Sequence, residues 1–170
     1  MHRAAGSEPL SESTLEALGL ALQDEYQAEA LYRQVLERHG DVRPFAHIVN
    51  AEQRHSAALE RVYGRRGLAA PDNLWQDLSQ ELQGKSLQEA CRVAVEAERD
   101  NVALYDELLG RDLPADVVQV FEHLRDASQL RHLPAFERCA SGAASKGPMR
   151  SAHAGCCGGR AKGRARKGQR

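Results

Sequence analysis

The chain carries one pattern of residues twice, and this internal repeat is the strongest constraint on its fold. Glu25 precedes Tyr32 by seven residues, and Glu98 precedes Tyr105 by the same interval. Seven residues make almost two turns of an α-helix, so the members of each pair lie on one helical face. We therefore expect the two halves of the chain to fold as two copies of one helical unit.

A second part of the repeat contains a slip of one residue. His55 follows Phe45 after ten residues, whereas His132 follows Phe121 after eleven. Each histidine nevertheless lies four residues before an apolar residue that is followed by Glu-Arg. We predict a one-residue bulge in the later segment, because such a bulge would place the two histidines in equivalent positions.

Capping and stop signals divide the repeat into four predicted helices, at residues 13–40, 44–64, 86–110 and 114–139. Ser13 with Glu16, and Ser86 with Glu89, have the spacing of a capping box. Short links join the helices into two antiparallel hairpins, whereas residues 65–85 hold two glycines and Pro71 and form a long crossover. The prediction is an all-α, ferritin-like antiparallel four-helix bundle with a long crossover between its second and third helices.

The charge distribution divides the chain into a bundle and a tail. Residues 1–139 hold 15 basic and 24 acidic residues, whereas residues 140–170 hold eight basic residues and no acid. We expect a flexible N-terminus over 1–12, the bundle over 13–139, and a disordered basic Gly/Arg-rich tail over 140–170. Such a tail either makes weak, sequence-independent contacts with nucleic acid or keeps the protein in solution.

Hydropathy and cysteine usage lead to an expected location. No stretch of about 20 apolar residues occurs, so we expect a cytoplasmic protein without a membrane span. The four cysteines form neither a Cys-x-x-Cys pair nor a secreted disulfide framework. We expect reduced thiols, with Cys91 packed as a small hydrophobic residue in the bundle.

Acids and histidines interrupt the apolar stripe of the predicted helices at mid-height. Several buried carboxylates in one core need a compensating charge, which a divalent cation supplies. Carboxylate oxygen combined with imidazole nitrogen suits iron, manganese or zinc. We predict a site for one or two metal ions, with iron preferred and with these ligands: Glu25, Glu52, His55, Glu98 and His132.

The second half of this site lacks a carboxylate. Ser128 aligns with Glu52, and Gln129 stands three residues before His132, where a symmetric site would have glutamate. A single ion or an asymmetric pair is therefore an alternative to a symmetric pair. The spacing does not select among three substitutes for the missing group: Glu29, Glu122 and Asp126.

Other polar residues receive supporting roles. We expect Glu29 to be an acid at the edge of the core that pairs with an arginine. His47 and His123 match each other in the repeat but lie off the stripe, so half-buried packing roles are predicted. Both repeat tyrosines are expected to form hydrogen bonds near the site and to shape access to it.

Short motifs add a family resemblance. The segment 18–59, with Asp-Glu-Tyr at 24–26, Val-Arg-Pro-Phe at 42–45 and Ala-Glu-Gln-Arg-His at 51–55, resembles a prokaryotic ferritin-like family catalogued as domain of unknown function 2202. Leu-Tyr-Asp at 104–106 and His-Leu-Pro-Ala-Phe at 132–136 extend the resemblance over roughly 14–139. It implies the fold and, by kinship with rubrerythrins and bacterioferritins, a metal-dependent redox role. The family itself has no established activity.

Two functional hypotheses follow. The first is an iron or other divalent-metal protein that reacts with oxygen or peroxide as an oxidoreductase, peroxidase or ferroxidase. The second is a non-catalytic binding or structural bundle with a degenerate metal site and a tail that attracts nucleic acid. A homodimer is compatible with both hypotheses.

Overall fold

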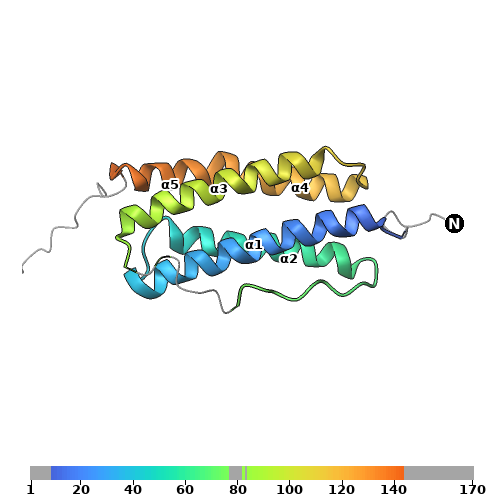
Figure 1. The fold of residues 1–170 in the computed structure, drawn as a ribbon, viewed down its shortest axis with the longest axis horizontal. Helices are drawn as coiled ribbons and strands as arrows, with labels where there is room; N and C mark the ends of the chain where they lie inside the picture. Colours follow the sequence, from blue (N-terminus) through green and yellow to red (C-terminus); the bar gives the residue numbers. More distant parts are fainter. Residues whose placement is uncertain (1–8, 77–81, 83, 144–170) are drawn as a thin grey trace, which may run out of the picture.

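Four helical rods pack side by side along their length (Figure 1). The computed structural model describes residues 9–76, 82 and 84–143. Within these residues there is no strand, so the all-α prediction is confirmed. The first three rods are α1 (Glu12–His39), α2 (Phe45–Gly64) and α3 (Leu87–Leu109). The fourth is continuous and consists of α4 (Ala115–Ala127), the π-helix η1 (Ser128–His132) and α5 (Leu133–Ala140).

The connectivity matches the predicted bundle. A short link joins α1 to α2, and another joins α3 to α4, so each pair forms an antiparallel hairpin. Figure 1 shows that α2 ends at one end of the bundle and α3 begins at the other, so the intervening chain crosses its full length. Residues 1–8 and 144–170, which include most of the predicted basic tail, lie outside the described residues.

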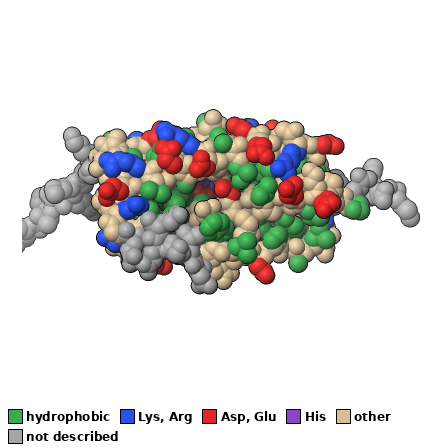
Figure 2. Space-filling model, viewed as in Figure 1, with side chains coloured by type: hydrophobic (Ala, Val, Ile, Leu, Met, Phe, Trp, Pro, Cys, Tyr) green, Lys and Arg blue, Asp and Glu red, His purple; other side chains and the backbone are tan. Residues whose placement is uncertain are grey.

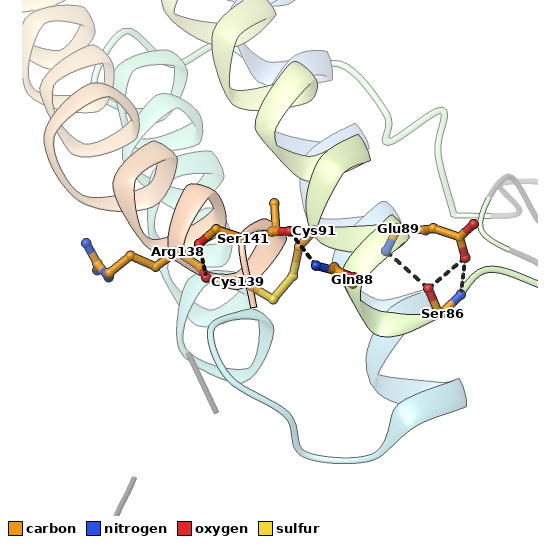
Figure 3. Close-up of a disulfide and its surroundings, with 8 residues drawn as sticks. Ser86, Gln88, Glu89, Cys91, Arg138, Cys139 and Ser141 are labelled. Carbon is orange, nitrogen blue, oxygen red and sulfur yellow. Dashed lines mark hydrogen bonds between the residues drawn. A yellow bond between two sulfur atoms is a disulfide. The ribbon is translucent and has the colours of Figure 1, made fainter. Parts of the chain in front are cut away.

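One predicted helix cap is confirmed and another is wrong. The Ser86 hydroxyl accepts a hydrogen bond from the Glu89 backbone N–H, and the Glu89 carboxylate accepts one from the Ser86 N–H, as a capping box requires (Figure 3). The first helix instead begins behind Ser11, whose hydroxyl oxygen accepts from the Thr14 N–H at 3.1 Å. The hydroxyl groups of Ser11 and Thr14 also lie 2.8 Å apart, and this pair replaces the expected Ser13 cap.

The apolar core is divided into two clusters, one toward each end of the bundle. One cluster includes Leu18, Leu22 and Phe121, and the other includes Phe45 and Phe136. Apart from Thr14 at the start of α1, the buried polar residues of every rod lie between these two clusters. The clusters therefore enclose a polar layer at mid-height.

A π-helical turn confirms the predicted bulge. In η1 the N–H of Leu133 donates to the carbonyl of Ser128, five residues earlier. One such turn inserts a single extra residue into a helix. It rotates the following residues, so that His132 and Phe136 are both buried, as His55 and Leu59 are in α2.

A disulfide bond corrects the expectation of reduced thiols. Cys91 and Cys139 are bonded, with their Cα atoms 5.8 Å apart, and they join α3 to α5 (Figure 3). Cys91 lies seven residues before Glu98 and Cys139 seven residues after His132. Because α3 and α5 are antiparallel, equal offsets in opposite directions bring the two sulfur atoms to the same level.

None of the helices in the described part of the chain combines the length and apolar character that a membrane-spanning helix needs.

Reduction of this disulfide is expected to lower thermal stability. The bond closes a loop with a sequence separation of 48 residues, and a cross-link of that kind stabilises a fold by about 2–4 kcal/mol. Dithiothreitol should therefore lower the Tm of the wild-type protein by roughly 5–15 °C in calorimetry. The double variant Cys91→Ala/Cys139→Ala should melt near the reduced wild type, with or without reductant. An unchanged wild-type Tm on reduction would contradict the disulfide.

Candidate metal centre

The polar layer brings together all five residues that the sequence proposed as metal ligands. One or two of them come from each rod, and every one is almost completely buried. Their exposed fractions are Glu25 0%, Glu52 1%, His55 7%, Glu98 2% and His132 4%. The packing of the two hairpins therefore concentrates three carboxylates and two imidazoles in the core.

The first hairpin supplies a closed group of three. The Nδ1 atom of His55 lies 3.0 Å from Oε2 of Glu25 and 3.0 Å from Oε2 of Glu52. Glu52 and His55 are three residues apart and so project from the same face of α2. Glu25 faces them from α1.

Glu52 also belongs to a second group, with Glu98 and His132. The Nδ1 atom of His132 lies 3.0 Å from Oε1 of Glu52 and 3.5 Å from Oε2 of Glu98. These are ion-pair distances, but neither approach has the alignment of a hydrogen bond, and both Glu52 Oε1 and His132 Nδ1 lack a hydrogen-bond partner among the described residues. Each oxygen of Glu52 thus faces one histidine. The two imidazole rings are stacked, with their centroids 5.4 Å apart.

Two tyrosines form hydrogen bonds from one hairpin to the other. Tyr105 of α3 donates to Oε1 of Glu25 at 2.6 Å, and Tyr32 of α1 donates to Oε1 of Glu98 at 2.7 Å. Each tyrosine therefore orients the glutamate of the other half. Burial and the neighbouring carboxylates raise the pKa of both phenols well above the usual value, so they remain protonated donors.

Two further polar residues belong to the layer and were not assigned from sequence. Asn101 donates to Oδ2 of Asp24 at 2.6 Å and lies 3.4 Å from Oε1 of Glu25. Burial raises the pKa of Asp24 to about 7, an effect that the Asn101 hydrogen bond opposes and the nearby glutamates reinforce. Asn101 lies on the apolar stripe of α3, and that position was the signal available in the sequence.

The carboxylates and histidines perturb each other strongly. Burial raises the pKa of Glu25 despite its hydrogen bond with His55. Burial acts on Glu52 in the same direction, but the two histidines outweigh it and lower the pKa of Glu52. Glu52 thus remains ionised more readily than Glu25, because Glu52 lies between both imidazoles.

The pKa values of the two histidines are also shifted by their surroundings. Burial alone would lower their pKa values, but the adjacent carboxylates raise the pKa of His55 to about 9 and that of His132 to about 10. At neutral pH both rings hold a proton and balance the carboxylates. A divalent cation would bind the same nitrogen and oxygen atoms, so it would displace these protons.

The missing carboxylate is not replaced by any of the three candidates from the sequence. Glu29 pairs with Arg33, as expected for an acid at the edge of the core. Glu122 and Asp126 are exposed, and Asp126 pairs with Arg125. The repeat position is occupied by Ser128, which is 1% exposed and whose Oγ has no partner among the described residues.

The predicted half-buried packing role of His47 and His123 is wrong. Both side chains are exposed and line a groove between α2 and the fourth rod. On their helices both residues are rotated away from the buried stripe, so their side chains face solvent.

The residues present fit a divalent cation. The candidate ligand atoms of Glu25, Glu52 and His55 lie within 4.8 Å of one another, as do those of Glu52, Glu98 and His132. Buried polar atoms are normally paired, so Glu52 Oε1 and His132 Nδ1 mark a position where a cation would satisfy both. The fold and the site define a helical-bundle protein with a buried carboxylate–histidine cluster that can hold metal.

Comparisons with known proteins agree with the fold. The chain is similar to the crystal structure of a hypothetical protein from Methanococcus jannaschii, with a TM-score of 0.71 and 21% sequence identity, over 80% of this chain and 84% of that one. No protein-family model matches the chain. No curated protein matches it either.

Because the two tyrosine–glutamate hydrogen bonds are equivalent, we expect removal of either one to lower the free energy of unfolding by the same amount. Tyr105→Phe and Tyr32→Phe each remove the hydroxyl donor of a buried glutamate, which costs about 1–3 kcal/mol. Urea unfolding of the metal-free protein should show this loss in both variants. Tyr63→Phe is the control, because the Tyr63 hydroxyl has only a 3.4 Å contact with a backbone carbonyl. A loss in only one of the two variants would contradict the equivalence of the halves.

Proposed function

We propose that this protein is a ferritin-like metalloprotein that binds up to two divalent ions, iron by preference, and reduces oxygen or peroxide. One observation carries the proposal: Glu52 belongs to both groups of ligands and presents one oxygen to each histidine. Carboxylates shared in this way are typical of bundle proteins that hold two metal ions. The resemblance of residues 14–139 to the ferritin-like family supports the same assignment.

Each half of the site would hold one ion with its own ligands. Glu25 and His55 would bind on one side, Glu98 and His132 on the other, and Glu52 would contact both. Manganese and zinc suit the same donors, and the preference for iron rests on the proposed redox role. A bound redox-active metal supplies electron exchange with oxygen or peroxide.

The chain's own residues would prepare this chemistry. Tyr105 and Tyr32 orient the terminal glutamates through hydrogen bonds of 2.6 and 2.7 Å, which is the role of outer partners in metal sites. The apolar clusters close the layer at both ends of the bundle. Protons released from the histidines on metal binding would leave toward the groove that both rings line.

A second function is favoured by Ser128. Because serine replaces the fourth carboxylate, the half formed by Glu98 and His132 is poorer in negative charge than a symmetric site. A non-catalytic bundle with a degenerate metal site is the corresponding alternative. The nucleic-acid role of the basic tail stays a prediction because residues 144–170 lie outside the described part of the chain.

The cytoplasmic location also stays a prediction. A buried disulfide between α3 and α5 is more typical of proteins in oxidising compartments. Fractionation of cells that express the tagged protein would decide the location.

Metal content and iron oxidation, measured together, separate the two functions. Protein expressed aerobically with added iron and analysed by mass spectrometry should contain about one to two metal ions per chain. Glu52→Ala should lose most of this metal, because it removes the ligand common to both groups. Oxidation of added Fe(II), followed by absorbance, should fall in parallel.

Glu122→Ala is the matched control. Glu122 is an exposed glutamate on α4, and no ion pair forms on it in the described structure, so metal content and iron oxidation should match the wild type. Less than about 0.2 ions per chain in the wild type, unchanged by Glu52→Ala, would refute metal binding. Full metal content without iron oxidation or peroxide consumption would favour the non-catalytic bundle.

A further inference from the structure

A groove with a volume of about 810 Å³ runs between α2 and the fourth rod. In the orientation of Figure 1, these rods lie behind α1 and α3, so the groove is on the far face. Its volume is within the range of small-molecule binding sites. Its walls carry five arginines: Arg43, Arg54, Arg61, Arg131 and Arg138.

The charge of this groove differs from that of the rest of the bundle. No aspartate or glutamate lines it, although acids outnumber basic residues over 1–139. Within the described residues none of its five guanidinium groups pairs with a carboxylate. The opposite face, over α1 and α3, shows acidic and basic side chains interspersed (Figure 2). The groove is therefore a concentrated and uncompensated positive region.

The internal repeat places matching residues on the two walls. Arg54 and Arg131 precede the two buried histidines by one residue, and Arg61 and Arg138 follow those histidines by six. His47 and His123 form a further matched pair across the groove. Since the π-turn keeps both walls in register, the groove has an approximate two-fold arrangement of positive groups.

The base of the groove is apolar and leads to the buried layer. Small side chains, including Ala51 and its repeat partner Ala127, lie between the arginines. His55 and His132 also line the groove, although each is nearly buried. A molecule in the groove would therefore contact carbon surface, guanidinium groups and the edge of the polar layer at the same time.

We propose that this groove binds a small organic anion, with its carboxylate or phosphate at the Arg54–Arg131 pair and its carbon skeleton on the alanines. Guanidinium groups recognise both kinds of acid group by paired hydrogen bonds. The binding uses arginines outside the metal ligands, so it does not depend on a bound metal. Its position makes the anion a candidate substrate or co-ligand of the polar layer.

Two other occupants fit the groove less well. A second copy of the chain joined through this face would bring two sets of five arginines together without acids to balance them. Single-stranded nucleic acid is bound on aromatic side chains that stack with bases, and no Phe, Tyr or Trp lines the groove. An organic anion uses both the positive charge and the small apolar base.

Calorimetric titration of metal-free, full-length protein with octanoate, octyl phosphate and uncharged octanamide tests the proposal. Octanoate or octyl phosphate should bind at least about tenfold more tightly than octanamide, because only the anions pair with guanidinium groups. The more tightly bound of the two identifies the preferred acid group. Arg54→Gln/Arg131→Gln should weaken anion binding at least about tenfold and leave octanamide unaffected.

Arg92→Gln/Arg99→Gln is the matched control, since it removes the same charge from exposed positions on α3, outside the groove. It should bind the anions as the wild type does. Equal binding of octanoate and octanamide, an equal loss in the control, or tighter binding of an eight-nucleotide oligothymidylate would each overturn the proposal. Retained anion binding in Glu52→Ala would show that the groove acts independently of the proposed metal site.

Discussion

Burial of the Glu52 carboxylate between two histidines is the interaction on which the rest of the bundle depends. A carboxylate that is 1% exposed would be strongly destabilising without partners. His55 reaches it from the same helix, and His132 reaches it from the other hairpin. The two hairpins therefore cannot slide past each other without separating a buried charge from its partner. This polar contact specifies the register that the apolar clusters alone would leave less well defined.

The repeat explains how such a layer is assembled from one simple unit. Each copy contributes a glutamate and a tyrosine seven residues apart, and each tyrosine bonds to the glutamate of the other copy. Because α1 and α3 are antiparallel, both bonds form at once only when Glu25 and Glu98 lie two turns apart along the pair. The spacing of seven residues therefore places Glu and Tyr on one helical face and also sets the hydrogen bonds between the two helices.

Much of the fold followed from the sequence because it depends on local signals and on this repeat. The four helices, the crossover and the bulge before His132 were all predicted from caps, glycines and spacing. The cap at Ser11 was missed because Ser11 and Ser13 both lie near the start of the helix, and only contacts such as the one between the Ser11 and Thr14 hydroxyl groups distinguish them. The disulfide was missed because pairing Cys91 with Cys139 needs the level at which α3 and α5 meet. The predicted contact between Glu98 and His132 already implied that level, because each cysteine lies seven residues from one of them.

The exposed side of the repeat could not be interpreted without the structure. His47 and His123 matched in sequence, but periodicity alone does not distinguish a half-buried position from the wall of a groove. Arginines and histidines occupy matching repeat positions on both walls of the groove, whereas inside the bundle Ser128 stands at the repeat position of Glu52. The two halves therefore differ at a buried position and match on the groove walls. Hydrogen bonds already satisfy His55, whereas His132 and the facing oxygen of Glu52 are unsatisfied. The group of Glu52, Glu98 and His132 is thus the one in which a cation would gain the most.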